Sequence, residues 1–304
     1  MTTQPVSLLS STTGLNNVVD PVRLRFDAQA GSQELAVALN VDVDQTGRVS
    51  RRRGYEQVNS TPCHSVWHGA GRTLAVSNGW IVLVGEDFSY LPLHDLAHGD
   101  ERVWFLDVNG DVFWGNGFET GILRRGMVPQ SWPFLMPQSE NDDRHLEAMP
   151  VGKNLELYNG RIFLAKDNAV FYSEPLGYYA TDLARNWFVF DSPVTMIRAV
   201  DDGLYVGTGT EVNYLGGPTV QEMVRRIVSS SPPIEGTCAK VDGGQIMSGE
   251  ILQKGVMWTA LDGIYAGFPQ GQVFNLTKDK LRYPGGNSGS AVVFDDVYLS
   301  LIDP

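Results

Sequence analysis

Short apolar runs joined by Asx-Gly pairs recur from residue 38 to the end of the chain. In one example, Leu-Ala-Val at 74–76 leads through Asn78-Gly79 to Trp-Ile-Val-Leu-Val at 80–84. Asn-Gly and Asp-Gly suit type I′ turns, because both residues tolerate positive φ and the turn's twist matches that of the paired strands. The pattern therefore predicts successive β-hairpins. Their turns are expected at Asn78-Gly79, Asn109-Gly110, Asn159-Gly160, Asp202-Gly203 and Asp262-Gly263.

The spacing of these turns is irregular but centred on the length of a propeller blade, about 40–50 residues. A single blade is a small twisted sheet that cannot bury both of its faces, whereas blades packed around an axis bury each other's faces. We therefore predict an all-β chain with an extended N-terminal arm at 1–37 and a β-propeller of about six blades at 38–304. Strands near Val297 are expected to share a blade with the hairpin at 38–58, so that strands from both termini close the ring.

Many hairpins also occur in β-sandwiches, and this alternative stays open. A sandwich protein of this length would need two domains and a linker, for which 126–150 is the best candidate. Helix signals are scarce. The stretch Thr-Val-Gln-Glu at 219–222 has the form of a capping box before Met-Val-Arg-Arg-Ile at 223–227, which predicts one short helix or turn between blades.

The composition agrees with an all-β fold. Apolar residues make up 42% of the 304 residues, enough for a core, and the 33 glycines and 16 prolines suit many tight turns. The two cysteines, Cys63 and Cys238, predict free thiols in a reducing compartment. Neither a secretion signal at 1–6 nor a membrane-spanning apolar segment is recognisable, so assembly in the cytoplasm without membrane insertion is expected.

Net charge also limits the function. The formal charge of −12 disfavours tight wrapping of duplex DNA and binding to anionic membranes. It is compatible with a passage through which DNA moves without sequence readout, because an acidic wall repels phosphates.

The histidines and glycine-rich stretches give no convincing catalytic motif. His94 and His98 have the spacing of a zinc-binding pair on a helix, but the acid of a His-Glu-x-x-His motif is absent and Pro92 favours a loop. The stretches at 207–210 and 285–289 lack the Lys-Ser/Thr ending of a phosphate-binding loop. We therefore predict no enzyme activity, no metal and no cofactor.

Charged residues offer two further candidate functional sites, one for docking to a partner and one for catalysis. Arg51, Arg52 and Arg53 form a basic point on an acidic chain and predict docking to a partner, whereas the arginine pairs at 124–125 and 225–226 are typical of strand-edge charge. Glu174, Asp191 and Glu211 could supply the acid and base of a glycosidase if they converged. A carbohydrate-binding or glycan-degrading propeller used in host receptor recognition is therefore the alternative function.

Three stretches of the sequence together resemble one family of proteins. The first comprises Gly-Leu-Asn-Asn-Val-Val-Asp-Pro-Val-Arg-Leu at 14–24, followed by the hairpin at 38–55 with Arg-Arg-Arg-Gly-Tyr. The second runs from Val-Asn-Tyr-Leu-Gly-Gly-Pro at 212–218 to 237. The third contains Trp258, Gly-Ile at 263–264, Gly267 and Asn-Leu-Thr at 275–277.

Together these stretches cover about a third of the chain and lie in order from end to end. They resemble the tail nozzle and tail-hub (phage stabilisation) proteins of short-tailed bacteriophages. The resemblance implies a structural protein of the virion tail (hub, nozzle or head-to-tail connection), whose copies, often six, form a homo-oligomeric ring around a DNA passage used in viral genome ejection. It also implies contacts with other tail or connector proteins. The chain departs from the family in lacking the long insertions of a nozzle.

Overall fold

In the computed structural model, the described residues are 11–24, 26–27, 32–44, 46–54, 56–135, 144–242, 254–294 and 297–303. Their regular structure is β-strand apart from three single-turn 3-10 helices, η1 (Pro21–Arg23), η2 (Val220–Glu222) and η3 (Pro269–Gly271). No helix within these ranges has the length and hydropathy needed to cross a bilayer. The predicted all-β class is confirmed.

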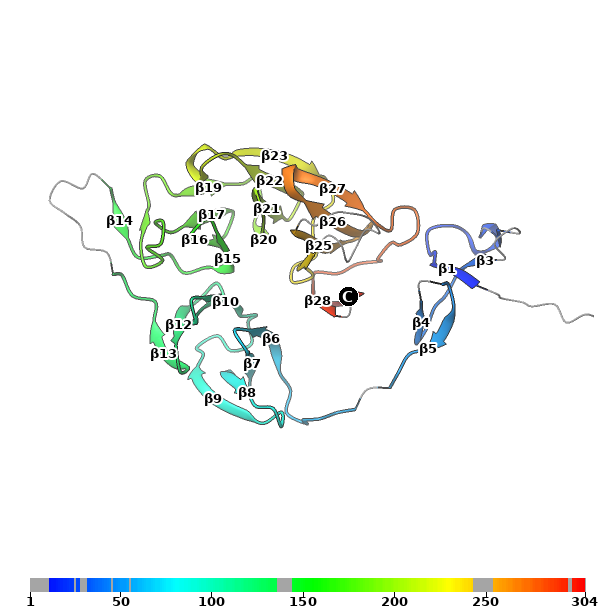
Figure 1. Cartoon of the computed structure of the whole chain (residues 1–304), viewed down its shortest axis with the longest axis horizontal. Coiled ribbons are helices and arrows are strands. Elements are labelled where there is room, and N and C mark those ends of the chain that lie inside the picture. The colour runs from blue at the N-terminus through cyan, green and yellow to red at the C-terminus, as the bar shows by residue number, and fades with distance from the viewer. Residues whose placement is uncertain are drawn as a thin grey trace, which may run out of the picture.

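Five four-stranded antiparallel sheets follow one another along the described ranges and lie around an arc (Figure 1). The first contains β6 (His64–Gly69), β7 (Arg72–Ser77), β8 (Trp80–Val84) and β9 (Tyr90–Asp95). The second contains β10 (Trp104–Val108), β11 (Asp111–Gly115), β12 (Thr120–Arg124) and β13 (Val128–Ser131). The third contains β15 (Lys153–Tyr158), β16 (Arg161–Lys166), β17 (Ala169–Tyr172) and β19 (Trp187–Val189). The fourth contains β20 (Val194–Val200), β21 (Gly203–Thr208), β22 (Val212–Gly216) and β23 (Val224–Ser229). The fifth contains β24 (Ala239–Asp242), β25 (Lys254–Ala260), β26 (Gly263–Phe268) and β27 (Gln272–Asn275).

The other strands form smaller sheets. In the N-terminal part, β3 (Ser32–Leu35) lies between β1 (Ser11–Leu15) and β2 (Phe26–Asp27), and β4 (Val41–Val43) pairs with β5 (Val49–Arg51). Beside the third sheet, β14 (Leu146–Glu147) pairs with β18 (Thr181–Asp182). At the C-terminus, β28 (Ser288–Phe294) pairs with β29 (Val297–Asp303) along its full length.

Apolar side chains fill the space between successive sheets, as a propeller-like arrangement requires. One cluster joins the third and fourth sheets, with Phe163 and Val206 fully buried. The next joins the fourth and fifth, where Trp258 is stacked on Tyr265 and also contacts Tyr205 of the preceding sheet. Tyr205 donates its hydroxyl proton to the Phe268 carbonyl at 2.5 Å. Each sheet therefore buries a face that it could not bury alone.

The predicted turns divide into two groups. The three Asn-Gly pairs lie between paired strands with positive φ at both residues, as in Asn109 (56°) and Gly110 (88°). At Asp202-Gly203 the hairpin is present, but its turn is shifted by one residue, to 201–202. Gly203 is already the first residue of β21 and pairs with Val200. The Asp202 side chain instead accepts hydrogen bonds from Tyr214 and from the backbone N–H of Gln270, which links this turn to η3.

The Asp262-Gly263 turn is also shifted by one residue, because Ala260 pairs with Gly263. The short helix or turn expected at the capping box is present, but not between two sheets. Thr219 donates to Glu222 and one turn of 3-10 helix forms, but Val224 then pairs with Gly216 as the start of β23. β-Branched residues that complete a sheet override the local helix signal. The turn lies within the fourth sheet rather than between sheets.

Strands from the two termini do not share a sheet, which corrects the predicted ring closure. Within the described residues, β4 pairs with β5 alone and β29 with β28 alone. The first four-stranded sheet begins only at His64, after an extended segment that leads away from the N-terminal strands (Figure 1). Of the predicted linker, 126–135 and 144–150 are described; β13 completes the second sheet there, and 136–143 lie outside the described residues.

The N-terminal strands are attached to the loop that follows the fifth sheet. Asn17 donates its side-chain amide proton to the Arg282 carbonyl at 2.8 Å and accepts the Arg282 N–H at 2.8 Å. Its backbone N–H donates to the Lys280 carbonyl at 2.9 Å. One asparagine therefore joins chain segments that are far apart in sequence.

The Asn17→Ala variant is expected to loosen this attachment, because it removes both side-chain hydrogen bonds, worth about 1–2 kcal/mol together. Trypsin should then cleave faster after Arg51, Arg52 or Arg53, and mass spectrometry of a digestion time course measures the rate. Asn168→Ala is the control, because it removes an amide bond to the Phe190 carbonyl inside the third sheet. Unchanged cleavage relative to wild type would contradict the role given to Asn17.

Candidate functional site

A buried ion-pair group links three sheets. The Glu156 carboxylate of β15 is only 2% exposed. It accepts a hydrogen bond from the Lys240 amine of β24 at 2.6 Å and lies 3.9 Å from the Arg198 guanidinium of β20. A carboxylate removed from water is tolerated only when cations and hydrogen bonds compensate for the lost hydration. This group is thus a structural tie between the third, fourth and fifth sheets.

A second charged group fixes the base of the C-terminal hairpin. Glu235 forms an ion pair with Lys153 at 2.6 Å and bridges to Ser288 at the start of β28. Arg102, which precedes β10, donates to the Gly289 carbonyl at 2.5 Å and to the Ser290 hydroxyl at 2.8 Å. Burial lowers the pKa of Arg102, and the Glu235 carboxylate opposes that shift. The C-terminal hairpin is therefore attached to the segment that leads into the second sheet as well as to the fifth sheet.

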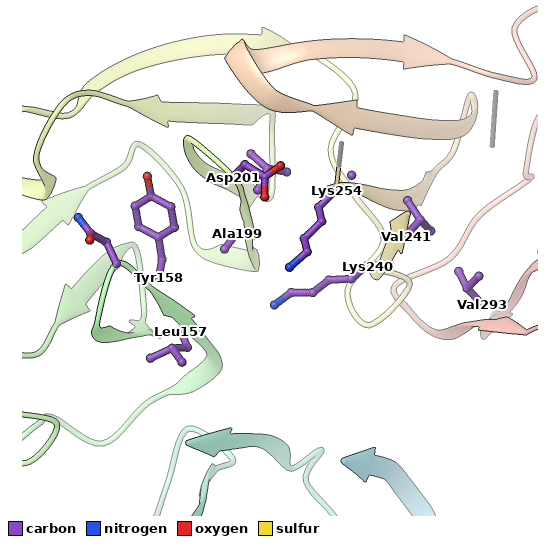
Figure 2. A pocket seen from close by; sticks show the side chains of 11 residues that line it. Leu157, Tyr158, Ala199, Asp201, Lys240, Val241, Lys254 and Val293 are labelled. Atoms are coloured by element: carbon purple, nitrogen blue, oxygen red, sulfur yellow. The ribbon is translucent and has the colours of Figure 1, made fainter. Parts of the chain in front are cut away.

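A cavity of about 750 Å³ lies beside these groups, between the third, fourth and fifth sheets. Figure 2 shows the amines of Lys240 and Lys254 pointing into the same space, with Tyr158 and Asp201 on the opposite side. Lys240 is already paired with Glu156. The lining is mixed in charge, and no group of three or more metal-ligating side chains occurs within the described ranges.

The C-terminal hairpin has two different faces. Ala291, Val293 and Tyr298 point towards the fifth sheet, and the Tyr298 hydroxyl donates to the Thr237 carbonyl at 2.5 Å. The opposite face carries a row of exposed apolar side chains, Val292, Phe294, Val297, Leu299 and Leu301, with Leu301 79% exposed. An uncovered apolar row of this kind marks a surface for association.

The predicted docking arginines lie at the end of the N-terminal hairpin. Arg51 is the last residue of β5, and all three arginines are exposed. Arg52 pairs with Asp42 across the hairpin at 2.9 Å. The arginines therefore sit on the same terminal hairpin that was expected to close the ring, remote from the cavity.

The three glycosidase candidates do not form one site. Asp191 and Glu211 both accept hydrogen bonds from Arg225, at 2.9 and 2.8 Å, and these bonds raise the pKa of Arg225. Glu174 lies elsewhere, bonded to Arg144 and Asn186. These carboxylates act as ion-pair acceptors in the structure. The two histidines with zinc-like spacing each have an aromatic neighbour: His98 stacks on Phe118, and His94 lies against Trp114.

The two thiols differ in accessibility. Cys63 is exposed, whereas burial raises the pKa of Cys238 to about 11. Because the thiolate is the reactive form, Cys63 alone should react rapidly with Ellman's reagent near pH 8, and both should react in urea. The Cys63→Ser variant should then be inert when folded. Rapid release of two equivalents from the folded wild type would contradict this assignment.

Comparison with known proteins finds solved structures of similar fold but no matching family. No protein-family model and no curated protein matches it. Two structures of the extracellular domain of the putative two component or one component system BT4673 from B. thetaiotaomicron are similar, with TM-scores of 0.49 and 0.50 and 12% identity; they cover 82% and 79% of this chain. The chain spans 34% and 31% of those two proteins. At 12% identity the likeness concerns the fold alone.

Two further solved structures match at lower similarity. Catalytically inactive virginiamycin B lyase from Staphylococcus aureus has a TM-score of 0.46 and 9% identity, over 79% of this chain and 84% of that one. The N-terminal domain of Nup159 has a TM-score of 0.46 and 11% identity, over 78% and 71%.

Proposed function

We propose that this protein is a structural component of a bacteriophage tail (hub, nozzle or head-to-tail connecting ring) that acts by association of copies rather than by catalysis. The observation that carries the proposal is the C-terminal hairpin, a half-sheet that leaves an apolar face uncovered next to the fifth sheet. A face of that kind is stabilised when another surface covers it.

The proposed finished molecule is a closed ring of six sheets. Five are the four-stranded sheets, and β28–β29 is half of the sixth. The core cluster that contains Val293 and Tyr298 supports this, because it continues the series of apolar clusters between sheets. Arg102 supports it as well, since this residue directly precedes the second sheet and donates a hydrogen bond to the C-terminal hairpin.

The hairpin supports association of copies, whereas the assignment to a phage tail rests on the sequence resemblance. The positions of the resembling stretches, the net charge and the paired carboxylates are compatible with that assignment. The third resembling stretch lies on β25, β26 and β27, and the first contains the end of β1, η1 and the β4–β5 hairpin. The net charge of −12 suits a ring through which DNA slides without being held. The buried carboxylate of Glu156 and the partly buried one of Glu235 are paired with cations, as in a scaffold.

Electron microscopy and light scattering of the purified protein test the proposal, together with mass spectrometry of purified virions. We expect ring-shaped particles and the protein in the tail. A persistent monomer that is absent from virions would contradict it. Turnover of a glycan substrate that a single Asp or Glu replacement abolishes would favour the glycan-degrading alternative.

A further inference from the structure

The C-terminal hairpin has one occupied edge and one open edge. The outer edge of β28 is bonded at its start, where the Gly289 N–H donates to the Glu235 carbonyl at 2.8 Å and Arg102 bonds to the Gly289 carbonyl. Within the described residues, β29 pairs only with β28. Unpaired N–H and C=O groups along β29 are thus a template for an added strand.

The N-terminal hairpin is the complementary half-sheet. Every large sheet of the arc has four strands, and β4–β5 and β28–β29 each have two. The pairing of β4 with β5 extends by one further hydrogen bond, from the Arg52 N–H to the Asn40 carbonyl at 3.0 Å. Joining the two hairpins through β29 would give a sheet of the same size as the other five.

The faces of the two hairpins also match. The register places Val41, Val43, Val49 and Arg51 on one face of β4–β5, with Asp42 and Ser50 on the other. On β29, Leu299, Leu301 and Asp303 share the exposed face. Each face is therefore apolar with a single charge at its end, basic on one hairpin and acidic on the other. Opposite charges on neighbouring strands favour pairing.

Within one chain the N-terminal hairpin does not occupy this edge. Asn17 and Lys280 hold the N-terminal strands on the loop after β27, and Figure 1 shows β4 and β5 beside β1 and β3, apart from β28. The segment that follows, 52–63, is extended and can span up to about 40 Å, so the hairpin lies away from the first sheet of its own chain, where another molecule can approach it. Exchange of an identical element between copies is a low-cost route to association.

We propose that the β4–β5 hairpin of one copy adds to the free edge of β29 in a second copy and completes its sixth sheet. The inference rests on the proposed association of copies and names the surfaces involved. Each copy gives one hairpin and receives one, so the contact is head-to-tail and closes into a ring when the rotation allows. The Arg51–Arg53 run then lies at the joint between copies.

Crosslinking between differently tagged chains tests the exchange. Both chains carry Cys63→Ser; one carries Val43→Cys and the other Leu301→Cys, and a short bis-maleimide spans the distance across neighbouring strands. We expect a mixed dimer on a denaturing gel. As the control, Val224→Cys replaces Leu301→Cys, because Val224 is also exposed, at 70%, but lies on the complete fourth sheet. No mixed dimer above the control overturns the inference.

A second measurement introduces negative charge on the exposed apolar face of β29. The Leu299→Glu and Leu301→Glu double variant should weaken self-association by about tenfold or more, measured by light scattering over a dilution series. Val224→Glu with Ile227→Glu is the matched control on β23, and circular dichroism checks that each variant is folded. Equal association of the two double variants overturns the inference.

The outcomes separate the inference from the proposed function. If wild-type copies form rings but the Val43–Leu301 crosslink fails, another surface joins them, and the tail role stands without the exchange. If a chain with both cysteines links only to itself at high dilution and in mixtures, the sheet closes within one molecule and the exchange is wrong. A wild type that stays monomeric and is absent from virions contradicts both.

Discussion

The Trp258→Ala variant is expected to lose about 3–5 kcal/mol of unfolding free energy, the usual cost of truncating a fully buried tryptophan. Trp258 is 0% exposed and stacks on Tyr265 with ring centroids 5.6 Å apart. It also contacts Tyr205 of the preceding sheet. The cavity left by the indole would therefore weaken the fourth and fifth sheets together. Urea denaturation followed by tryptophan fluorescence and circular dichroism measures the loss.

Trp80→Ala is the matched control for this experiment. Trp80 is 39% exposed and begins β8 directly after a turn. We expect its truncation to cost roughly 1 kcal/mol, since less apolar surface returns to water. Equal losses for the two variants would mean that Trp258 does not join the sheets in the way described.

The Glu156→Ala variant should be the next most destabilised, by about 2–4 kcal/mol. Its removal leaves Arg198 and Lys240 without their shared carboxylate, and Arg198 is partly buried. Lys240 is half-exposed and regains water, so the loss should fall below that of a fully buried pair. Thermal and urea unfolding measure it.

Asp42→Ala provides the comparison on the surface. It breaks the ion pair with Arg52, in which both side chains are about half-exposed. Exposed pairs contribute about 0–1 kcal/mol. If the Asp42 and Glu156 variants lost the same stability, the carboxylate of Glu156 would not tie three sheets together.

Local features of the fold could be predicted from sequence. Strand pairs on both sides of Asn78-Gly79, Asn109-Gly110 and Asn159-Gly160 follow from turn chemistry within a few residues. The short helix or turn expected after Thr219 forms, but its position inside the fourth sheet could not be predicted from a local signal. A capping box is a local signal, whereas the strand at 224–229 depends on pairing with β22.

The candidate site lay beyond sequence reasoning, because its parts meet only in the folded chain. Glu156, Arg198 and Lys240 come from three sheets, and no spacing rule connects them. The sequence indicates the exposed apolar row on β28–β29 only in part, because Ala-Val-Val-Phe at 291–294 is apolar on both faces of the strand. Which of its two faces the fifth sheet covers depends on Tyr298 and Thr237, which are far apart in sequence.

The order of pairing has a consequence for synthesis of the chain. In four of the five large sheets every strand pairs with its predecessor in sequence, so these sheets can form one after another as the polypeptide leaves the ribosome. The hairpin with the uncovered apolar row follows all five sheets in sequence. A nascent chain therefore lacks this apolar surface until the five sheets have been made, which limits early aggregation between chains on one polysome.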